Sequence, residues 1–433
     1  MLALGHCGEV GMSQKYQAPK GVSEYFPPRS SIFELAIEHL KRPALAAGYQ
    51  LMELPIFEDT EVFSRGVGES TDVVSKEMYT FEDRGGRSLT LRPEGTAGVM
   101  RAVIEHNLDR GQLPLKVFYT GPFFRAERPQ AGRYRQFFQF GIEAIGVEDP
   151  YLDAEVISVA WHGYRSLGLK NFTLKVGSLG DAPSRTAHRN ELVKYISSLK
   201  LDEETKNRAA KNPLRLFDDK RPEIKVLMAK APLLLDYLNE KSKENFESVQ
   251  EILSNQKIEF VVDPMMVRGL DYYTGTTFEF DHGDLGAQSG IGGGGRYDGL
   301  METLGGQSLS GIGFGLGVDR IILAMEAEGV APTNRNYLDL FVIPLGESAK
   351  SIGYSIVESV RKSGFVADLA FGERSLKGAM KAADHRMAHY VLVIGDDEVG
   401  SGTAQLKKMS DGSTSSVTLT SLVDALKKLS TRP

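Results

Sequence analysis

Hydrophobic and polar residues alternate with the period of a helix in two stretches near the start of the chain. Apolar residues recur every three or four positions over 30–42, the spacing of an amphipathic helix. We expect Ser30 or Ser31 to cap this helix and Pro43 to kink or end it. The same spacing predicts a second helix over 96–108.

Strand patterns occur between and after these helices. Aromatic and β-branched residues are dense over 115–128 and 133–146, and a Gly-Gly turn divides two further strands within 78–95. Short loops join successive strands, whereas parallel neighbours need a longer crossover. The pattern therefore predicts an antiparallel sheet in this part of the chain.

The pattern changes twice further along. Residues 182–256 are strongly charged with a helical pattern, which predicts an inserted helical subdomain, and strand character returns at Ile258. Turn residues without periodicity over 328–337 predict a domain linker. Beyond it, strands and helices alternate over 338–397, which predicts a small α/β domain with parallel neighbouring strands.

Composition restricts the class of protein. The chain has 433 residues, enough for two or three domains, and its 41% hydrophobic and 25% charged residues are an ordinary globular balance. One cysteine excludes an intramolecular disulfide, which fits a reducing compartment and predicts a cytoplasmic protein. No apolar run approaches the ~20 residues that span a bilayer, so no membrane association is expected. Because the formal net charge is −6, a partner made of phosphate requires a local basic surface.

Two motifs suggest chemistry that their surroundings do not support. The glycines at 290–295 match a dinucleotide-binding pattern, but they open into RYDGL rather than a helix. His385 and His389 have the i, i+4 spacing of metal ligands, but Arg386 takes the place of a metalloprotease glutamate, so a solvated helix face is the better interpretation. The sequence contains no P-loop, so any bound ATP needs another cradle.

Polar residues along 133–146 predict a ligand site. Cations lie at one end of this strand face, an amide in the middle and a carboxylate at the other end, which suits an elongated ligand with an anionic end. The two-residue period places six residues on this face: Arg133, Arg135, Phe137, Gln139, Gly141 and Glu143. We expect Gly141 to leave room for the ligand. From Arg125 to Arg135 the chain has four arginines and one glutamate, and arginine suits the clamping of phosphates.

Carboxylates and arginines recur at three other places. Glu94 and Thr96 lie at a strand-to-helix turn, and Arg320 lies at the start of a helix, where a cation is unfavourable unless an anion binds. Arg268 interrupts a predicted half-buried strand, and a buried guanidinium requires an anion. Strict alternation puts Arg268 and Tyr273 on opposite faces, so a bulge must shift the register if both line one pocket. Arginines converging on a polyphosphate are one way to carry out nucleotidyl transfer.

These stretches resemble the class II aminoacyl-tRNA synthetases. Residues 124–143 are similar to their motif 2, 313–321 to motif 3, and 48–58 to motif 1, which usually builds a dimer interface. The peptides VRGLDYYTG at 267–275 and GGGRYDGL at 293–300 are characteristic of the histidyl-tRNA synthetase subgroup. The five motifs occur in the expected order, and the resemblance extends from about Gln17 to the end of the chain.

The resemblance implies activation of L-histidine with ATP to histidyl-adenylate and pyrophosphate, followed by transfer of histidine to the 3′ end of tRNA(His). Arg268 and Arg125 are the implied catalytic residues, with Arg268 binding the histidine carboxylate and the α-phosphate. ATP is gripped by Arg125, Arg133 and Arg320, and Mg²⁺ accompanies its phosphates. The residues implied to bind histidine are Glu94, Gly95, Thr96, Gln139, Glu143, Arg268, Tyr272, Tyr273 and Tyr297.

The same resemblance implies the domain organisation. An α+β catalytic domain with an antiparallel sheet covers 17–333, with the helical insertion at about 182–256, and a small α/β anticodon-binding domain covers 334–433. Residues 1–16 are expected to form a disordered extension, and the protein is expected to be a homodimer. One alternative is the non-catalytic regulatory subunit of ATP phosphoribosyltransferase, which typically lacks the C-terminal domain and parts of the ATP and histidine motifs. Another is a class II synthetase for a different amino acid.

Overall fold

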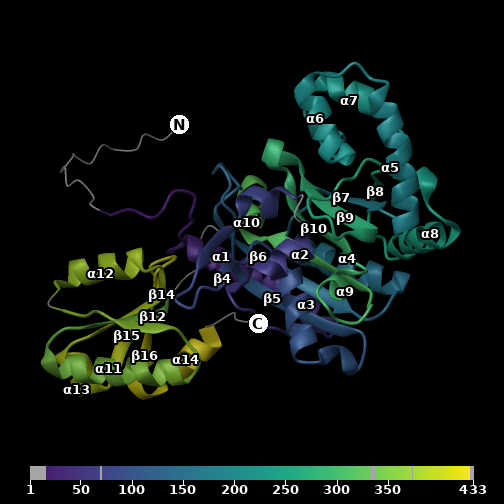
Figure 1. Cartoon of the computed structure of the whole chain (residues 1–433). Helices are drawn as coiled ribbons and strands as arrows, with labels where there is room; N and C mark the ends of the chain where they lie inside the picture. The colour runs from purple at the N-terminus through teal and green to yellow at the C-terminus, as the bar shows by residue number, and fades with distance from the viewer. Residues whose placement is uncertain (1–15, 69–70, 332–337, 373, 430–433) are drawn as a thin grey trace. The chain divides into compact units, whose positions relative to one another are not determined.

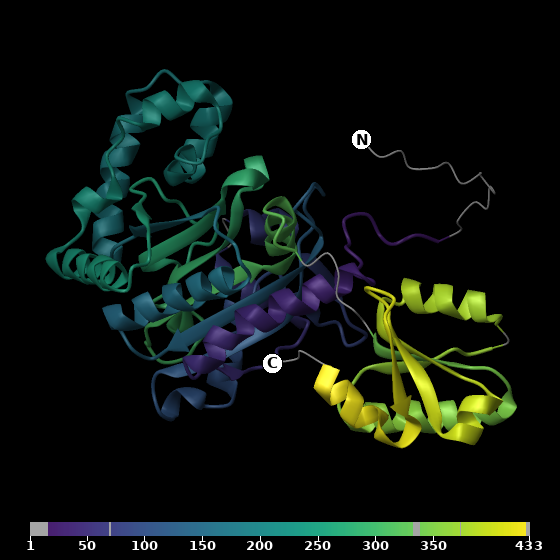
Figure 2. The same cartoon turned by 180° about the vertical axis from the view of Figure 1, so that it is seen from behind.

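The computed structural model describes residues 16–68, 71–331, 338–372 and 374–429 (Figures 1 and 2). The expected disordered extension therefore lies almost wholly outside the described residues, as does part of the expected linker. The chain divides into two compact units between Ala331 and Pro332. Over the described ranges, no helix combines the length and the apolar character needed to cross a bilayer.

The first unit is built on an eight-stranded sheet, and its strand order is β1-β5-β6-β11-β10-β9-β7-β8. The six central strands pair antiparallel, as predicted, while the two edge strands pair parallel to their neighbours. The strands in sheet order are β1 (Gln50–Leu51), β5 (Leu115–Phe124), β6 (Gln136–Ile145), β11 (Gly311–Gly317), β10 (Gly290–Arg296), β9 (Thr274–His282), β7 (Phe172–Ser178) and β8 (Val261–Val262).

Four helices cover one face of this sheet: α1 (Arg29–Ala46), α4 (Pro150–Ser166), α8 (Glu240–Asn255) and α10 (Val318–Ala327). In Figure 2, α1 in purple and α4 in blue lie side by side in front of the sheet. Although α8 falls within the predicted insertion, its buried Phe246, Val249 and Leu253 pack into this main core. Residues 99–103 and 300–301 cover part of the other face, where they pack against Val117 and Tyr119 of β5.

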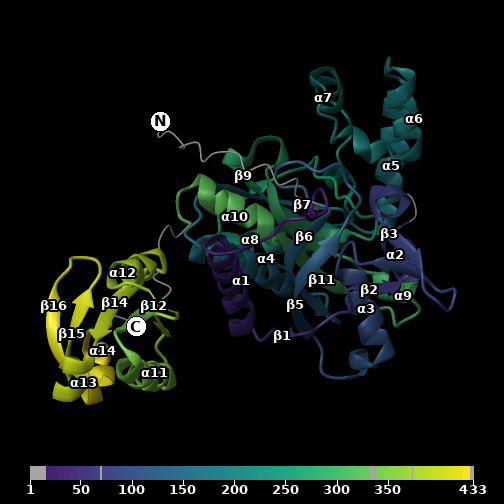
Figure 3. The same ribbon diagram turned by 90° about the vertical axis from the view of Figure 1, so that its left-hand side faces the viewer.

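Smaller elements gather at the edge of that second face (Figure 3). A three-stranded antiparallel sheet has the order β2-β4-β3, and the predicted Gly-Gly turn joins β3 to β4. Its strands and the helices around it are β2 (Phe57–Asp59), α2 (Thr60–Val67), η1 (Val73–Glu77), β3 (Tyr79–Glu82), β4 (Ser88–Leu91), α3 (Thr96–Glu105), η2 (Leu108–Arg110) and α9 (Leu300–Thr303). Helix η5 (Gly283–Gln288) lies between β9 and β10 in the chain and contacts α10 instead.

A group of short helices projects from the first unit near the top of Figure 1. They form a small core of their own around Leu192, Leu216 and Met228. These helices are α5 (Ala182–Ser197), α6 (Glu203–Lys211), η3 (Pro213–Leu216), α7 (Pro222–Met228) and η4 (Leu234–Tyr237).

The second unit is an α/β domain, which confirms the alternation predicted from the sequence. Its five strands have the order β13-β12-β14-β15-β16; the first three are parallel and the last two antiparallel. Its elements are β12 (Leu338–Pro344), α11 (Glu347–Lys362), β13 (Ala367–Leu369), α12 (Leu376–His385), β14 (Ala388–Ile394), α13 (Asp396–Ser401), β15 (Thr403–Lys408), β16 (Thr414–Thr418), η6 (Leu419–Ser421) and α14 (Leu422–Leu429).

Three local predictions are wrong. The N-cap of α1 is Pro28, without a side-chain cap, and not Ser30 or Ser31. Pro43 does not end helix α1, which continues to Ala46 with buried residues on both sides of the proline. His385 ends α12 while His389 lies in β14, so these two residues do not share a helix face.

Candidate active site

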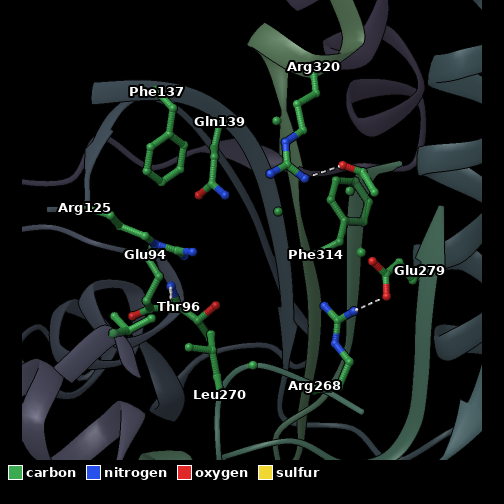
Figure 4. Close-up of a pocket in the computed structure, with 18 of the residues that line it drawn as sticks. Glu94, Thr96, Arg125, Phe137, Gln139, Arg268, Leu270, Glu279, Phe314 and Arg320 are labelled. Atoms are coloured by element: carbon green, nitrogen blue, oxygen red, sulfur yellow. Dashed lines mark hydrogen bonds and ion pairs between the residues drawn. The ribbon is translucent and has the colours of Figure 1, made fainter. Parts of the chain in front are cut away.

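A pocket of about 370 Å³ opens on the face of the central strands opposite α1, α4, α8 and α10 (Figure 4). Its walls come from β5, β6, β9, β10 and β11, the start of α3, the start of α10 and the loop before β9. Most of the residues expected at the site line this one pocket, although they are far apart in sequence. They are Glu94, Gly95, Thr96, Arg125, Arg133, Gln139, Arg268, Tyr272, Tyr273, Tyr297 and Arg320.

Arg125 and Arg320 are held in place by backbone carbonyls. Arg125 Nε donates to the Pro93 carbonyl at 2.9 Å, and its guanidinium carbon lies 5.3 Å from the centre of the Phe137 ring. Arg320 donates to two carbonyls at 2.6 Å, from Nε to Gly132 and from Nη1 to Gly290. Burial lowers the pKa of both groups, which makes a bound anion favourable.

Arg133 has a different environment. Its guanidinium is paired with Glu127 and lies 3.7 Å from Glu77, with 40% of its side chain exposed. A ligand phosphate must therefore compete with these carboxylates. Arg135, expected on the same strand face, does not line the pocket and donates to the Glu127 carbonyl at 3.2 Å.

Arg268 lies on a loop and not in a strand, which corrects the prediction for this segment. Strand β8 ends at Val262 and β9 begins at Thr274. Free of strand alternation, Arg268 and Tyr273 both line the pocket, and the guanidinium carbon is 4.9 Å from the centre of the Tyr273 ring. No bulge is needed to bring them together.

Glu279 is a pocket residue that the sequence interpretation missed. Its Oε2 lies 3.5 Å from Nη1 of Arg268 (Figure 4). The signal was present, because Glu279 stands between Phe278 and Phe280, which are both completely buried on the opposite face of β9. A carboxylate at an alternating position of a core strand indicates a polar site on the other face.

Glu94 caps helix α3 from inside the pocket. Its two carboxylate oxygens accept hydrogen bonds from the backbone N–H of Thr96 at 2.8 Å and of Ala97 at 3.0 Å. The Tyr272 hydroxyl lies 3.3 Å from the same carboxylate. Burial raises the pKa of Glu94, while these donors oppose the rise. Gly95 leaves space for the ring of Tyr119, since a Cβ at Gly95 would lie 2.4 Å from that ring.

Glu143 lies beneath the pocket and does not line it. It is completely buried and accepts hydrogen bonds from the hydroxyls of Thr96, Tyr119 and Tyr297 at 2.8, 3.1 and 2.7 Å. Desolvation raises its pKa to about 8, despite these donors. The carboxyl thus acts on the pocket through the hydroxyls that surround it.

The expectation that Gly141 makes room for a ligand is wrong. A Cβ at Gly141 would lie 2.3 Å from the Tyr119 ring, so the space belongs to Tyr119. Tyr119 is a second pocket residue that the sequence interpretation missed. It shares the two-residue period of β5 with Phe123 and Arg125, which could have indicated it.

Comparison with known proteins identifies the family. A family model described as Histidyl-tRNA synthetase matches residues 21–321, and one described as Anticodon binding domain matches residues 339–429. The chain belongs to the histidyl-tRNA synthetase family. This agrees with the antiparallel sheet and with the arginine-rich pocket on its open face.

Relatives within this family match over nearly the whole chain. A histidine–tRNA ligase of Nocardia farcinica is 59% identical over 96% of this chain and 98% of that protein. A histidine–tRNA ligase of Corynebacterium urealyticum is 57% identical over 96% of this chain and 97% of that protein. Apo histidyl-tRNA synthetase from S. aureus superposes with a TM-score of 0.80 at 37% identity, covering 95% of this chain and 100% of that chain.

These matches overturn the two alternatives. The relatives named above, matched over nearly their whole length, are histidine–tRNA ligases and neither a regulatory subunit nor a synthetase for another amino acid. The dinucleotide interpretation of the glycines at 290–295 also fails, because they form a strand in the middle of the sheet.

Proposed function

We propose that this chain activates L-histidine with ATP to histidyl-adenylate, releasing pyrophosphate, and then transfers histidine to the 3′ end of tRNA(His). The observation that carries the proposal is the position of Arg268, Arg125 and Arg320 around one pocket of a histidyl-tRNA synthetase family member. Three cations placed around a polyphosphate supply the positioning and charge stabilisation on which phosphoryl chemistry depends.

Arg268 is the proposed catalytic centre. The histidine carboxylate is ionised near neutral pH and attacks the α-phosphorus, so this step needs no general base. The carboxylate oxygen forms a bond to phosphorus, and the bond from phosphorus to the bridging oxygen of pyrophosphate breaks. Negative charge accumulates on the α-phosphate oxygens, where a fixed guanidinium stabilises it. Arg125 is assigned the same phosphate from the opposite side of the pocket.

The histidine substrate is assigned to a set of polar groups in the same pocket. Glu94 and Thr96 at the start of α3 receive the α-amino group. Gln139 and the tyrosines Tyr272, Tyr273 and Tyr297 surround the imidazole. Glu143 orients the Tyr297 hydroxyl, which donates to it at 2.7 Å. A side chain that cannot hydrogen-bond leaves such groups unpaired, and discrimination by ~10⁴-fold follows.

ATP is assigned to the arginine-rich side, with the Phe137 ring near the nucleotide and Arg320 at the terminal phosphate. We propose that Mg²⁺ accompanies the β- and γ-phosphates. This ion needs only one or two carboxylates in addition to phosphates and water, and Glu127, which lines the pocket and is paired with Arg133, would supply one of them. The bound ion would supply positive charge to the pyrophosphate leaving group.

We also propose the domain organisation and the assembly. The catalytic domain covers 17–333, with a helical insertion at about 182–256, and the anticodon-binding domain covers 334–433, in agreement with the family models. A cytoplasmic homodimer is proposed. Its interface is assigned to the stretch 48–58, where Leu51, Ile56 and Phe57 are 58%, 45% and 51% exposed.

The proposal is tested by ATP–pyrophosphate exchange with each standard amino acid in turn. We expect exchange with histidine and background values with the others, including proline and threonine. Exchange without amino acid, or with a different one, is incompatible with the proposed function. A protein that binds histidine but exchanges nothing has the behaviour of a regulatory subunit.

A further inference from the structure

Arg268 depends on few contacts for its position. Only 15% of its side chain is exposed, yet its Nε has no hydrogen-bond partner among the described residues. The segment that carries it lies outside any strand, between the end of β8 at Val262 and the start of β9 at Thr274. Side-chain contacts must therefore fix the guanidinium: its carbon lies 4.9 Å from the centre of the Tyr273 ring, and the carboxylate beside it is Glu279.

Glu279, in contrast, is fixed on a rigid element. It lies within β9, paired on one side with Gly293 of β10 and on the other with Lys175 of β7. The neighbouring Phe278 and Phe280 anchor the strand in the main core.

The glycines of β10 provide the space for this ion pair. A Cβ at Gly290 would lie 2.8 Å from Oε1 of Glu279, and one at Gly293 would lie 3.0 Å from Nη1 of Arg268. Larger residues at either position would press on the carboxylate or on the guanidinium. The glycines at 290–295, which match a dinucleotide-binding pattern, therefore make room for the ion pair between Glu279 and Arg268.

Other charges near Glu279 are already paired or are repulsive. Lys175 Nζ lies 2.8 Å from Oδ2 of Asp281, so the nearest lysine is engaged by another carboxylate. Asp281 and Asp218 are negative and disfavour the Glu279 charge, while Arg268 favours it. Arg268 is thus the cation with which Glu279 forms its ion pair.

We propose that Glu279 is a positioning residue for Arg268. It holds the guanidinium toward the reacting atoms, and its own negative charge weakens binding of the anionic substrates before reaction. The inference rests on the proposed function, because it assigns a role within the same adenylation step. Loss of the Glu279 charge releases Arg268 and removes the repulsion, so kcat and the KM for ATP fall together.

The test is histidine-dependent exchange with Glu279→Gln. We expect kcat to fall about 10- to 100-fold, since misplacement by an ångström has that scale of effect, while the KM for ATP decreases. Glu251→Gln is the control: it removes an exposed carboxylate of α8 that does not line the pocket. It should retain both constants. A merely structural role of Glu279 lowers the active fraction of Glu279→Gln without decreasing KM.

A double variant separates positioning from direct action. If Glu279 acts through Arg268, adding Glu279→Gln to Arg268→Ala causes no further loss of kcat. Additive losses, or wild-type constants in Glu279→Gln, overturn the inference while wild-type exchange still supports the proposed function. Absence of histidine-dependent exchange in the wild type overturns the proposed function, and the inference with it.

Discussion

Glu143 lies beneath the pocket and affects it through three hydroxyls. Its pKa of about 8 comes mainly from desolvation and lies above its ordinary value of 4.5. The folded protein therefore retains a proton that the unfolded chain releases. Stability contributed by this group is fully present below about pH 4.5 and is lost as pH rises through about 8.

Glu143→Gln should lack this pH dependence, because an amide does not ionise in that range. The free energy of unfolding of the variant, relative to the wild type, is expected to rise between about pH 4.5 and 8 and to level off above that. Denaturant titrations at pH 5 and 8.5 measure the difference. Glu251→Gln, at an exposed position of α8, controls for loss of one carboxyl. Identical pH trends in the two variants would contradict the assignment.

Arg268→Ala should abolish most of the adenylation activity while the protein stays folded, since the residue lies on a loop. Removing one preorganised charge at a reacting centre costs about 10²- to 10³-fold in kcat. Arg65→Ala is the control, because this arginine is 61% exposed on α2 and lies away from the pocket. Near-normal exchange in Arg268→Ala, with far-ultraviolet circular dichroism unchanged, would exclude the proposed role.

At the scale of elements, strand β10 shows a constraint that hydropathy cannot reveal. A Cβ at Gly294 would lie 1.9 Å from the Gly313 carbonyl oxygen of the adjacent strand β11. The backbone cannot move aside as a flexible side chain can. A larger residue at position 294 would therefore force β10 and β11 apart locally. The close approach of β10 and β11 in the sheet that carries the pocket therefore requires glycine at position 294.

Gly294→Ala should therefore lower the free energy of unfolding by about 1–3 kcal/mol or more. Gly98→Ala is the control in the same unit: it lies in α3, and its added Cβ would meet its nearest atoms at 3.6 and 3.9 Å. Its effect should stay within about 1 kcal/mol, since alanine favours helix. Thermal unfolding of both variants measures the contrast, and equal melting temperatures would refute it.

Elements with a clear hydrophobic period were predictable, and elements shaped by neighbours were not. The amphipathic pattern of α1 and the aromatic runs of β5 and β6 identify their type, because burial imposes the period. Strand β10 has no such signal, since it is almost all glycine. The sequence of residues 267–272 resembles that of a strand because several of them are aromatic or apolar. These residues line the pocket, and they are not the alternating core positions of a strand.

The site was predictable where motifs carry it and not where tertiary contacts create it. The arginines, Glu94, Thr96 and Gln139 belong to recognisable stretches, and the fold brings them into one pocket. Two features depend on strand register. They are the pairing of Glu279 with Arg268 and the position of the Tyr119 ring in the space beside Gly141. Register is a long-range property that a single sequence does not display.

At the scale of the whole molecule, a chain with net charge −6 requires a local cationic surface for tRNA. The second unit has a groove between β13 and α12 that combines cations with an exposed aromatic ring. Phe371 is 56% exposed, and Arg374, Lys381 and Arg386 line the same groove. Rings and cations together suit unstacked bases and their phosphates.

Lys381→Ala should weaken tRNA(His) binding and reduce the slope of its salt dependence by about one. Histidine-dependent exchange, which needs no tRNA, should be unchanged. Lys427→Ala, in α14 and outside the groove, is the control. Filter binding over a range of salt concentrations measures the effect. Equal binding by Lys381→Ala and wild type would exclude the groove as a tRNA contact.

We propose above that this pocket joins histidine to ATP through Arg268 for the charging of tRNA(His). The most direct measurement is charging of tRNA(His) with labelled histidine by the wild type and by Arg268→Ala in one assay. We predict ATP-dependent charging by the wild type and a loss of at least about 100-fold in the variant. Absence of histidine charging by the wild type, or equal charging by the folded variant, would contradict the account.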